Sequence, residues 1–271
     1  MPIYILLILA IVQGATEFLP ISSSGHLALL YNILGVNNDQ MLLTILLHIA
    51  TLIAVLIYYR KEIITLILHP LCPTNRKLVL STIATTIVYM CLHRIIKNSF
   101  DGKYLFVCFI FTAILLLISD YMSERNSILS RTQQKLLKNP QCNTLDITHF
   151  PISYSQAIVL GFTQGIAIMP GISRSGSTIA VANMMGVASA PTYSFLLSIP
   201  AILGGLVATI LDGGFTTNIS SVSLLFAMLI CTIIGLVSIW LVGMLNSKNK
   251  LCYFSYYLIA LSSILVIISF F

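Results

Sequence analysis

The chain has 271 residues, of which 58% are hydrophobic and 8% are charged, and its mean hydropathy is +0.98. These values exclude an ordinary soluble domain and indicate an integral membrane protein. A membrane-crossing helix needs about 20 mostly apolar residues, so the chain has room for about six to ten embedded helices and no large soluble domain. We therefore expect an all-α polytopic membrane protein with a single membrane domain over residues 1–271.

The net charge of +6 comes from 14 Lys and Arg against 8 Asp and Glu, and most cations lie between apolar stretches. This distribution indicates membrane topology, whereas nucleic-acid binding would need a basic face on a soluble fold. We expect membrane lipids as surroundings and no nucleic-acid partner. The six cysteines show no paired spacing, which argues against a disulfide framework or a zinc site.

The first 40 residues contain an apolar run that a polar stretch interrupts. IYILLILAIV leads into QGATEFLPISSSGHL, residues 13–27, which carries a glutamine, a glutamate, three serines and a histidine. Irregular backbone at membrane depth is tolerated only where protein encloses it or where it lines a polar cavity. This stretch predicts a re-entrant hairpin, in which two short helices meet within the membrane.

Six later segments are apolar and about long enough to cross a membrane. They lie at about residues 41–59, 78–96, 104–120, 193–211, 221–245 and 252–271. Cations mark three loops between them, with Arg60, Lys61, Arg76 and Lys77 in the first, Arg125, Arg131, Lys135 and Lys138 in the second, and Lys248 and Lys250 in the third. The positive-inside rule places all three loops in the cytoplasm. The chain must then enter and leave the membrane on one side over residues 150–190, which predicts a second hairpin.

The two polar stretches are related to each other. When the sequence is shifted by 151 positions, Gln13 aligns with Gln164, and nine of 24 positions are identical without a gap. Each copy comprises a re-entrant hairpin and three transmembrane helices, over residues 1–120 and 151–271, joined by a cytoplasmic linker at 121–150. Since three crossings is an odd number, the copies form an inverted-topology repeat whose polar stretches face each other.

The copies differ at the positions that carry chemistry. Glu17 aligns with Ile168, His26 aligns with Ser177, and Ser23 aligns with Arg174. One cavity that joins both stretches would hold a hydroxyl, a carboxylate, an imidazole and a guanidinium. These are the groups that phosphoryl transfer needs for attack, proton transfer and charge stabilisation.

In the first stretch, Ser23 is the candidate nucleophile, His26 the candidate acid/base, and Glu17 a candidate metal ligand or proton acceptor. One helical turn would bring Ser23 and His26 to one face. In the second stretch, PGISRSGST, Arg174 can bind phosphoryl oxygens with two hydrogen bonds. Hydroxyls of Ser173, Ser175, Ser177 and Thr178, and backbone N–H groups made approachable by Gly176, lie there at the expected start of a helix.

Structural alternatives stay open for several of these residues. Serines and glycines in membrane helices commonly serve close packing, which applies to Ser22. Glu17 and Arg174 could form an inert ion pair, although a charged group at membrane depth indicates function by default. His48, within LLTILLHIATL, fits either a supporting role at the site or a packed helix position.

QGATEFLPISSSGHL and PGISRSGSTIA resemble the two signature motifs of the bacterial undecaprenyl pyrophosphate phosphatase family, the bacitracin-resistance type. The resemblance extends to LLHIATLIAVLIYYRKE and YSFLLSIPAILGG. It implies hydrolysis of this polyprenyl pyrophosphate to the monophosphate carrier used in peptidoglycan synthesis, with a divalent cation such as Mg or Ca. It also implies bacitracin resistance and a site in the bacterial inner (plasma) membrane that faces the periplasm.

The resemblance transfers roles to individual residues. Glu17, Ser23, His26 and Arg174 match the catalytic positions, and Glu17 would also bind the metal. The substrate-binding candidates are Gln13, Ser22, Ser24, Ser173, Ser175, Gly176 and Thr178. Gln13 departs from the glutamate often found at its position, which weakens the case for metal binding by two carboxylates.

Three questions stay open at this point. Either Ser23 or His26 could be the nucleophile, because a histidine can also accept a phosphoryl group. Inverted repeats with broken helices are also a common transporter plan, so a transporter or flippase of the lipid carrier phosphate is the alternative function. A homodimer is a further expectation for the assembly.

Overall fold

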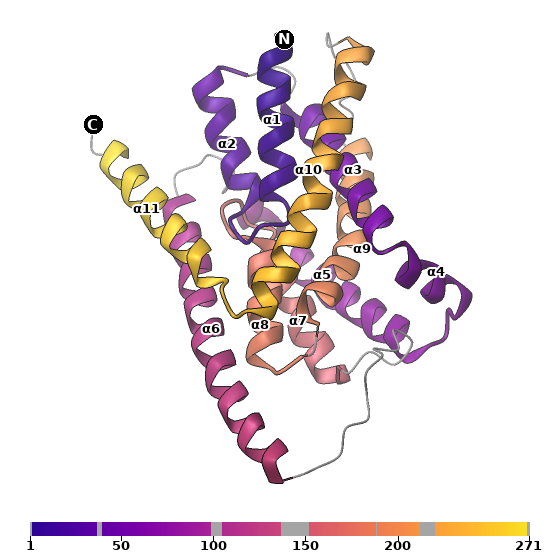
Figure 1. Cartoon of the computed structure of the whole chain (residues 1–271). Coiled ribbons are helices and arrows are strands. Elements are labelled where there is room, and N and C mark those ends of the chain that lie inside the picture. The colour runs from indigo at the N-terminus through magenta and orange to yellow at the C-terminus, as the bar shows by residue number, and fades with distance from the viewer. Residues whose placement is uncertain are drawn as a thin grey trace.

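The computed structural model describes residues 2–36, 40–98, 105–136, 152–187, 189–211 and 220–269, and all regular elements within these ranges are α-helices (Figure 1). The all-α prediction is therefore confirmed. The helices are α1 (Ile3–Thr16), α2 (Ser23–Leu34), α3 (Gln40–Tyr58), α4 (Arg60–Leu68), α5 (Pro73–Asn98), α6 (Leu105–Leu136), α7 (Tyr154–Ile166), α8 (Arg174–Met184), α9 (Ala190–Leu211), α10 (Ser221–Ser247) and α11 (Cys252–Ser269).

Among the described residues, three helical segments are long and apolar enough to cross a membrane: Leu105–Ser123, Ala190–Val207 and Ser221–Ser247. A fourth candidate is the pair Leu43–Tyr58 and Arg60–Leu68, which is bent by 78°. The chain is therefore a multi-pass membrane protein. The other two predicted crossings are also helical, but the polar, threonine-rich α5 and the shorter apolar segment Cys252–Ile268 do not meet the same criteria.

Two predicted loops are partly helical. Arg60 and Lys61 begin α4, which forms because Leu66 is buried and Ile63 packs against the core, so this segment is amphipathic. The linker predicted over residues 121–150 begins inside α6, which continues to Leu136, and residues 137–150 lie outside the described ranges. Cations mark the end of an apolar segment whether the chain there is a loop or an amphipathic helix, so the sequence pattern could not distinguish the two. The division at residues 121–150 stays a prediction.

Both polar stretches break the chain between two short helices, and serine side chains start the second helix of each pair. The Ser22 Oγ accepts from the Gly25 backbone N–H at 3.3 Å, and the Ser173 Oγ accepts from the Gly176 backbone N–H at 3.1 Å. Such caps satisfy N–H groups that a helix leaves unpaired in its first turn. The polar stretches therefore end one helix and begin the next.

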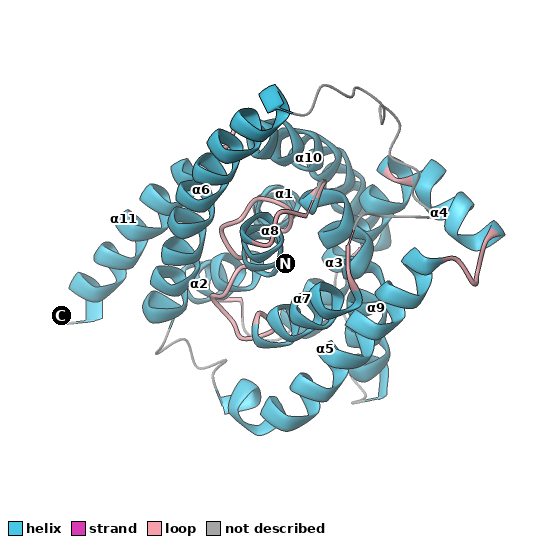
Figure 2. Ribbon diagram, turned by 90° about the horizontal axis from the view of Figure 1, so that it is seen from below, coloured by secondary structure: helices cyan, strands magenta, loops and turns pink. Residues whose placement is uncertain are grey.

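Helices α1 and α8 lie in the middle of the bundle, with α3, α6, α9 and α10 around them (Figure 2). Helix α1 packs on α10 and α2, and α8 packs on α6, α7 and α9. Leu9 of α1 and Ile179 of α8 are fully buried. This packing brings the end of α1 and the start of α8, with their polar residues, to the centre of the protein.

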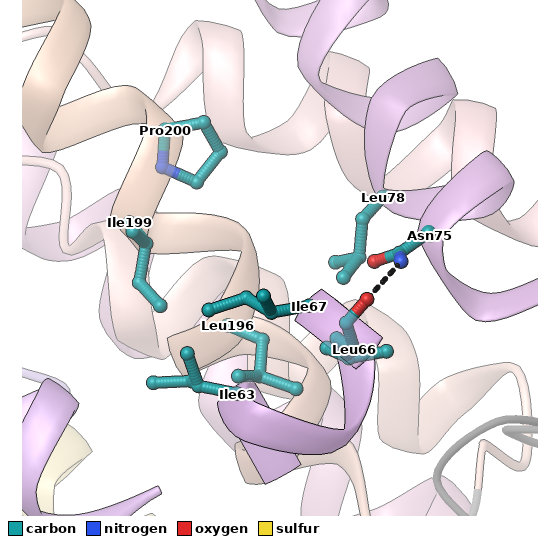
Figure 3. Close-up of a pocket in the computed structure, with 8 residues that line it drawn as sticks. All are labelled: Ile63, Leu66, Ile67, Asn75, Leu78, Leu196, Ile199 and Pro200. Atoms are coloured by element: carbon teal, nitrogen blue, oxygen red, sulfur yellow. Dashed lines mark hydrogen bonds between the residues drawn. The ribbon is translucent and has the colours of Figure 1, made fainter. Parts of the chain in front are cut away.

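A separate apolar cavity of about 310 Å³ lies between α4, the start of α5 and α9 (Figure 3). Ile63, Leu78 and Pro200 are among its lining residues. The side-chain N–H of Asn75 donates to the Leu66 carbonyl at 2.8 Å, so this polar group closes the last turn of α4. The cavity contains none of the predicted site residues.

Candidate active site

The two polar stretches meet through an ion pair. Glu17 is the C-cap residue of α1 and Arg174 is the first residue of α8, and Arg174 Nη2 donates to Glu17 Oε1. The Glu17 side chain is 4% exposed and that of Arg174 is 18% exposed. The structure thus joins residues that are 157 positions apart in the chain into one site.

Glu17 has further polar neighbours from the first half of the chain. Its Oε2 accepts from the Ser23 hydroxyl at 2.6 Å and from the Gln13 amide at 3.0 Å. His48 Nε2 lies 3.5 Å from the same oxygen, so His48 belongs to the site. A buried carboxylate is costly unless it is paired and hydrogen-bonded, and these contacts provide both.

The contact between Ser23 and Glu17 has the geometry of a nucleophile and its base. Ser23 is half-buried, and its hydroxyl points at a carboxylate oxygen within hydrogen-bonding distance. A carboxylate in this place can accept the hydroxyl proton as the oxygen attacks an electrophile. Arg174, held by the other oxygen of Glu17, could bind an anionic electrophile with its guanidinium group.

His26 lies one turn after Ser23 but has different partners. Its Nδ1 is 2.7 Å from the Ser22 carbonyl oxygen, and its Nε2 is 2.7 Å from the Tyr257 hydroxyl on α11. The ring of Phe109 is tilted by 58° to the imidazole, with a centroid distance of 5.6 Å. Ser23 and His26 were predicted to share one face of the helix. In the structure their side chains bond to other groups and not to each other.

The hydroxyls of the second stretch are buried and bonded within the protein. Ser173 is 1% exposed and caps α8, while Ser175, at 3%, bonds to the Leu19 carbonyl at 3.3 Å. Thr178, at 1%, donates to the Arg174 carbonyl at 2.8 Å and lies 2.5 Å from the Ser194 hydroxyl. Arg174 is the group of this stretch that reaches the site, and substrate binding by the three hydroxyls stays a prediction.

The remaining predicted binding residues support the backbone. Ser22 caps α2, and the Ser24 hydroxyl lies 3.3 Å from that of Ser22. At Gly176, a Cβ would lie 2.9 Å from the Cβ of Pro20, so glycine allows the two stretches to approach closely. The backbone N–H of Gly176 is already bonded to Ser173.

Sequence reasoning missed three partners of the site residues. Tyr257 bonds to His26, Ser194 bonds to Thr178, and the Thr112 hydroxyl accepts from the Ser173 backbone N–H at 3.0 Å. All three lie in apolar helices, and the partners are 231, 16 and 61 positions apart in the chain, respectively. Neither their residue type nor their spacing carries a signal that could have identified them.

The residues can be compared with the needs of the divalent cation that the resemblance implies. The described residues contain no group of three or more His, Cys, Asp or Glu that could hold a metal ion. Mg²⁺ is commonly held by one or two carboxylates together with substrate phosphates. The Glu17 carboxylate and Gln13 Oε1, a buried oxygen that has no hydrogen-bond partner in the described part of the chain, fit a cation shared with a phosphate ligand.

Comparison with known proteins covers almost the whole chain. The family described as bacitracin resistance protein BacA matches residues 6–264. An undecaprenyl-diphosphatase of Methanosphaera stadtmanae is 36% identical, with 97% of this chain and 96% of that protein aligned. Undecaprenyl-diphosphatase of Methanococcus maripaludis and undecaprenyl-diphosphatase 4 of Bacillus cereus are each 35% identical, over 94% and 97% of this chain and 96% of each relative. This chain belongs to the bacitracin resistance protein BacA family.

Proposed function

We propose that the chain is an undecaprenyl-diphosphatase, which hydrolyses undecaprenyl pyrophosphate to undecaprenyl phosphate and phosphate. The observation that carries this proposal is the Glu17 carboxylate, which bonds the Ser23 hydroxyl with one oxygen and the Arg174 guanidinium with the other. A nucleophile, its base and an oxyanion-binding group are thereby assembled in a chain that aligns with named undecaprenyl-diphosphatases along nearly its full length. Recycling of the lipid carrier for peptidoglycan synthesis and bacitracin resistance follow from this activity.

The Ser23 oxygen attacks the terminal phosphorus, and its proton passes to Glu17. The bond from that phosphorus to the bridging oxygen breaks, undecaprenyl phosphate leaves, and a phosphoserine forms. Arg174 exchanges its contact with Glu17 for the phosphoryl oxygens, where its positive charge stabilises the transition state. Water then attacks the phosphoserine, which releases phosphate and regenerates the hydroxyl.

His26 serves as acid/base in this scheme. It protonates the leaving oxygen or accepts a proton from the attacking water. The structure favours Ser23 over His26 as nucleophile, because Ser23 is bonded to a carboxylate base whereas both ring nitrogens of His26 have neighbours at 2.7 Å.

A divalent cation such as Mg or Ca is part of the proposal. The Glu17 carboxylate and Gln13 Oε1 would hold it together with the pyrophosphate oxygens. The bound cation would neutralise negative charge on the phosphoryl oxygens. Since the described residues provide one carboxylate at the site, we expect weak binding of the cation in the absence of substrate.

We further propose that the chain is an inverted-topology repeat with a re-entrant helix pair in each half. The first pair, α1 and α2, lies in the upper part of the bundle, and the second pair, α7 and α8, lies in the lower part (Figure 1). In this arrangement α7 corresponds to α1, and α10 corresponds to α5. The packing supports the correspondence, since α1 packs on α10 just as α7 packs on α5.

Two aligned glycines support the same correspondence. A Cβ at Gly14 would lie 2.5 Å from the Cys231 carbonyl oxygen on α10. A Cβ at Gly165 would lie 2.5 Å from the Val88 Cβ on α5. Each glycine therefore allows close contact with the equivalent helix of the other half.

We place the protein in the bacterial inner membrane with its site facing the periplasm. In a cysteine-free variant, a membrane-impermeant maleimide added to intact spheroplasts should label Asn32→Cys on α2 and should not label Lys61→Cys on α4. Labelling of Lys61→Cys alone would overturn this orientation. The homodimer stays a prediction.

The function is tested with purified protein in liposomes that contain undecaprenyl pyrophosphate. The wild type should release phosphate in the presence of Mg²⁺ or Ca²⁺, and Arg174→Ala should release it about 10³-fold more slowly. Movement of the lipid between leaflets without any phosphate release would instead support the flippase alternative. Full phosphate release by Arg174→Ala would exclude a site built from both stretches.

A further inference from the structure

The imidazole ring of His26 is held from three sides. The Ser22 carbonyl contacts Nδ1, the Phe109 ring of α6 lies on one side, and Tyr257 of α11 contacts Nε2. The rings of His26 and Tyr257 are stacked, with a centroid distance of 5.7 Å and an interplanar angle of 14°. Tyr257 is 231 positions from His26 in the chain, so tertiary packing alone creates this contact.

The contacts determine where the proton of a neutral His26 lies. A carbonyl oxygen only accepts hydrogen bonds, so Nδ1, at 2.7 Å from the Ser22 oxygen, carries the proton. Nε2 then carries the lone pair and is the nitrogen able to exchange a proton in catalysis. Tyr257 faces this nitrogen, and its hydroxyl can donate to neutral Nε2 or accept from protonated Nε2.

The position of α11 fits a supporting role at the site. Helix α6 supplies Thr112 to the start of α8, where its hydroxyl accepts from the Ser173 backbone N–H. Helix α11 supplies Tyr257 to the first turn of α2, where its hydroxyl contacts the side chain of His26. The last helix of each half thus supports the polar stretch of the other half.

We propose that Tyr257 is a positioning residue for the phosphatase reaction and keeps the His26 ring in the orientation from which Nε2 exchanges protons. During turnover the Tyr257 hydroxyl stays beside Nε2, which it shares with the leaving-group oxygen or the attacking water. The ring stack and the dual capacity of the hydroxyl keep His26 in place in both of its protonation states. The inference rests on the proposed function, because it assigns a role within the same site.

The test compares Tyr257→Phe, which keeps the stacked ring and removes the hydroxyl, with Tyr257→Ala, which removes both. Loss of one hydrogen bond corresponds to a decrease in kcat of about three- to tenfold, while KM for undecaprenyl pyrophosphate stays within about twofold of wild type. Tyr257→Ala should lose more activity than Tyr257→Phe. Tyr256→Phe is the matched control, since Tyr256 neighbours Tyr257, is 60% exposed and has no hydrogen-bond partner among the described residues.

A second readout reports on the hydrogen bond without relying on activity. In protein labelled with ¹⁵N-histidine, the Nε2 signal of His26, assigned with His26→Asn, should shift in Tyr257→Phe and stay unchanged in Tyr256→Phe. Wild-type kcat together with an unshifted Nε2 signal in Tyr257→Phe would overturn the inference while leaving the phosphatase proposal in place. A wild-type protein that releases no phosphate would overturn both.

Discussion

The polar stretches 13–27 and 164–178 share a sequence pattern but use it differently. In the first, the side chains of Gln13, Glu17 and Ser23 bond to one another around a single carboxylate. In the second, Ser173, Ser175 and Thr178 bond mainly to backbone groups of the stretch and its neighbours, and Arg174 is the side chain that reaches the shared site. In the proposed site, the first stretch would thus supply most of the reactive groups, and the second would supply one cation.

The two capping serines show the same difference in backbone conformation. Ser22 has a φ of 70°, which non-glycine residues rarely adopt, whereas its counterpart Ser173 has a φ of −77°. A residue held in such a region costs about 1–3 kcal/mol and persists where the surrounding structure requires it. The Ser22 carbonyl accepts from His26 Nδ1, so the strained residue is bonded to the histidine. The second stretch has no histidine at the aligned position.

The largest effect that the comparison predicts is for Ser23→Ala. Removal of the nucleophile should lower the rate of phosphate release by about 10⁴-fold, leaving the activity that binding and charge stabilisation alone provide. Ser155→Ala on the exposed face of α7 should retain wild-type activity and serves as the control. A larger loss in His26→Ala than in Ser23→Ala would identify His26 as the nucleophile.

Arg174→Ala should lower kcat by about 10³-fold, because it removes the positive charge at the transferring phosphoryl group. It also leaves the buried Glu17 carboxylate without its ion-pair partner, which should destabilise the protein by about 3–5 kcal/mol in detergent unfolding measurements. Glu17→Gln combined with Arg174→Gln should recover stability without activity. Full activity with reduced stability in Arg174→Ala would show that the pair is structurally important and catalytically inert.

His26 and Ser177 occupy aligned positions in the two stretches, so their variants can be compared directly. His26→Ala should lower kcat by about 10²-fold, as expected for the loss of a general acid/base. Ser177 is 1% exposed and its hydroxyl has no hydrogen-bond partner among the described residues, so Ser177→Ala should change activity by less than about twofold. Equal losses in both variants would show that the two stretches contribute to chemistry alike.

The smallest predicted effect on activity is that of replacing Gln13, which we compare with replacing the aligned Gln164. Gln13 donates to Glu17, so Gln13→Leu should lower activity by about tenfold, the magnitude of one hydrogen bond to a charged group. Gln164 lies 3.3 Å from both the Thr85 hydroxyl and the Leu197 carbonyl, so Gln164→Leu should lower stability by about 1 kcal/mol and leave kcat unchanged. Phosphate release and thermal unfolding of both variants measure the difference, and a lower kcat in Gln164→Leu alone would contradict the assignment.

Much of the site was visible in the sequence because polar residues stand out against apolar helices. The alignment of Gln13 with Gln164 predicted that the two stretches meet, and the contact between Glu17 and Arg174 agrees with that expectation. The sequence could not separate a serine that caps a helix from one that faces a ligand, because both occur at the start of a helix after a turn. This is why Ser173 and Ser175 were predicted to bind substrate although the structure gives Ser173 a capping role and Ser175 a backbone partner.

The sequence by itself determined the all-α membrane fold, the two breaks and the residue types available for chemistry. These features are local, since they depend on hydrophobic length, capping serines and the cost of a charge at membrane depth. Only the tertiary structure decided which atoms pair, such as Ser23 with Glu17 across a helix break and His26 with Tyr257 across 231 positions. Such pairs depend on how α8 and α11 pack against the first half, and packing over that separation leaves no periodic signal in the chain.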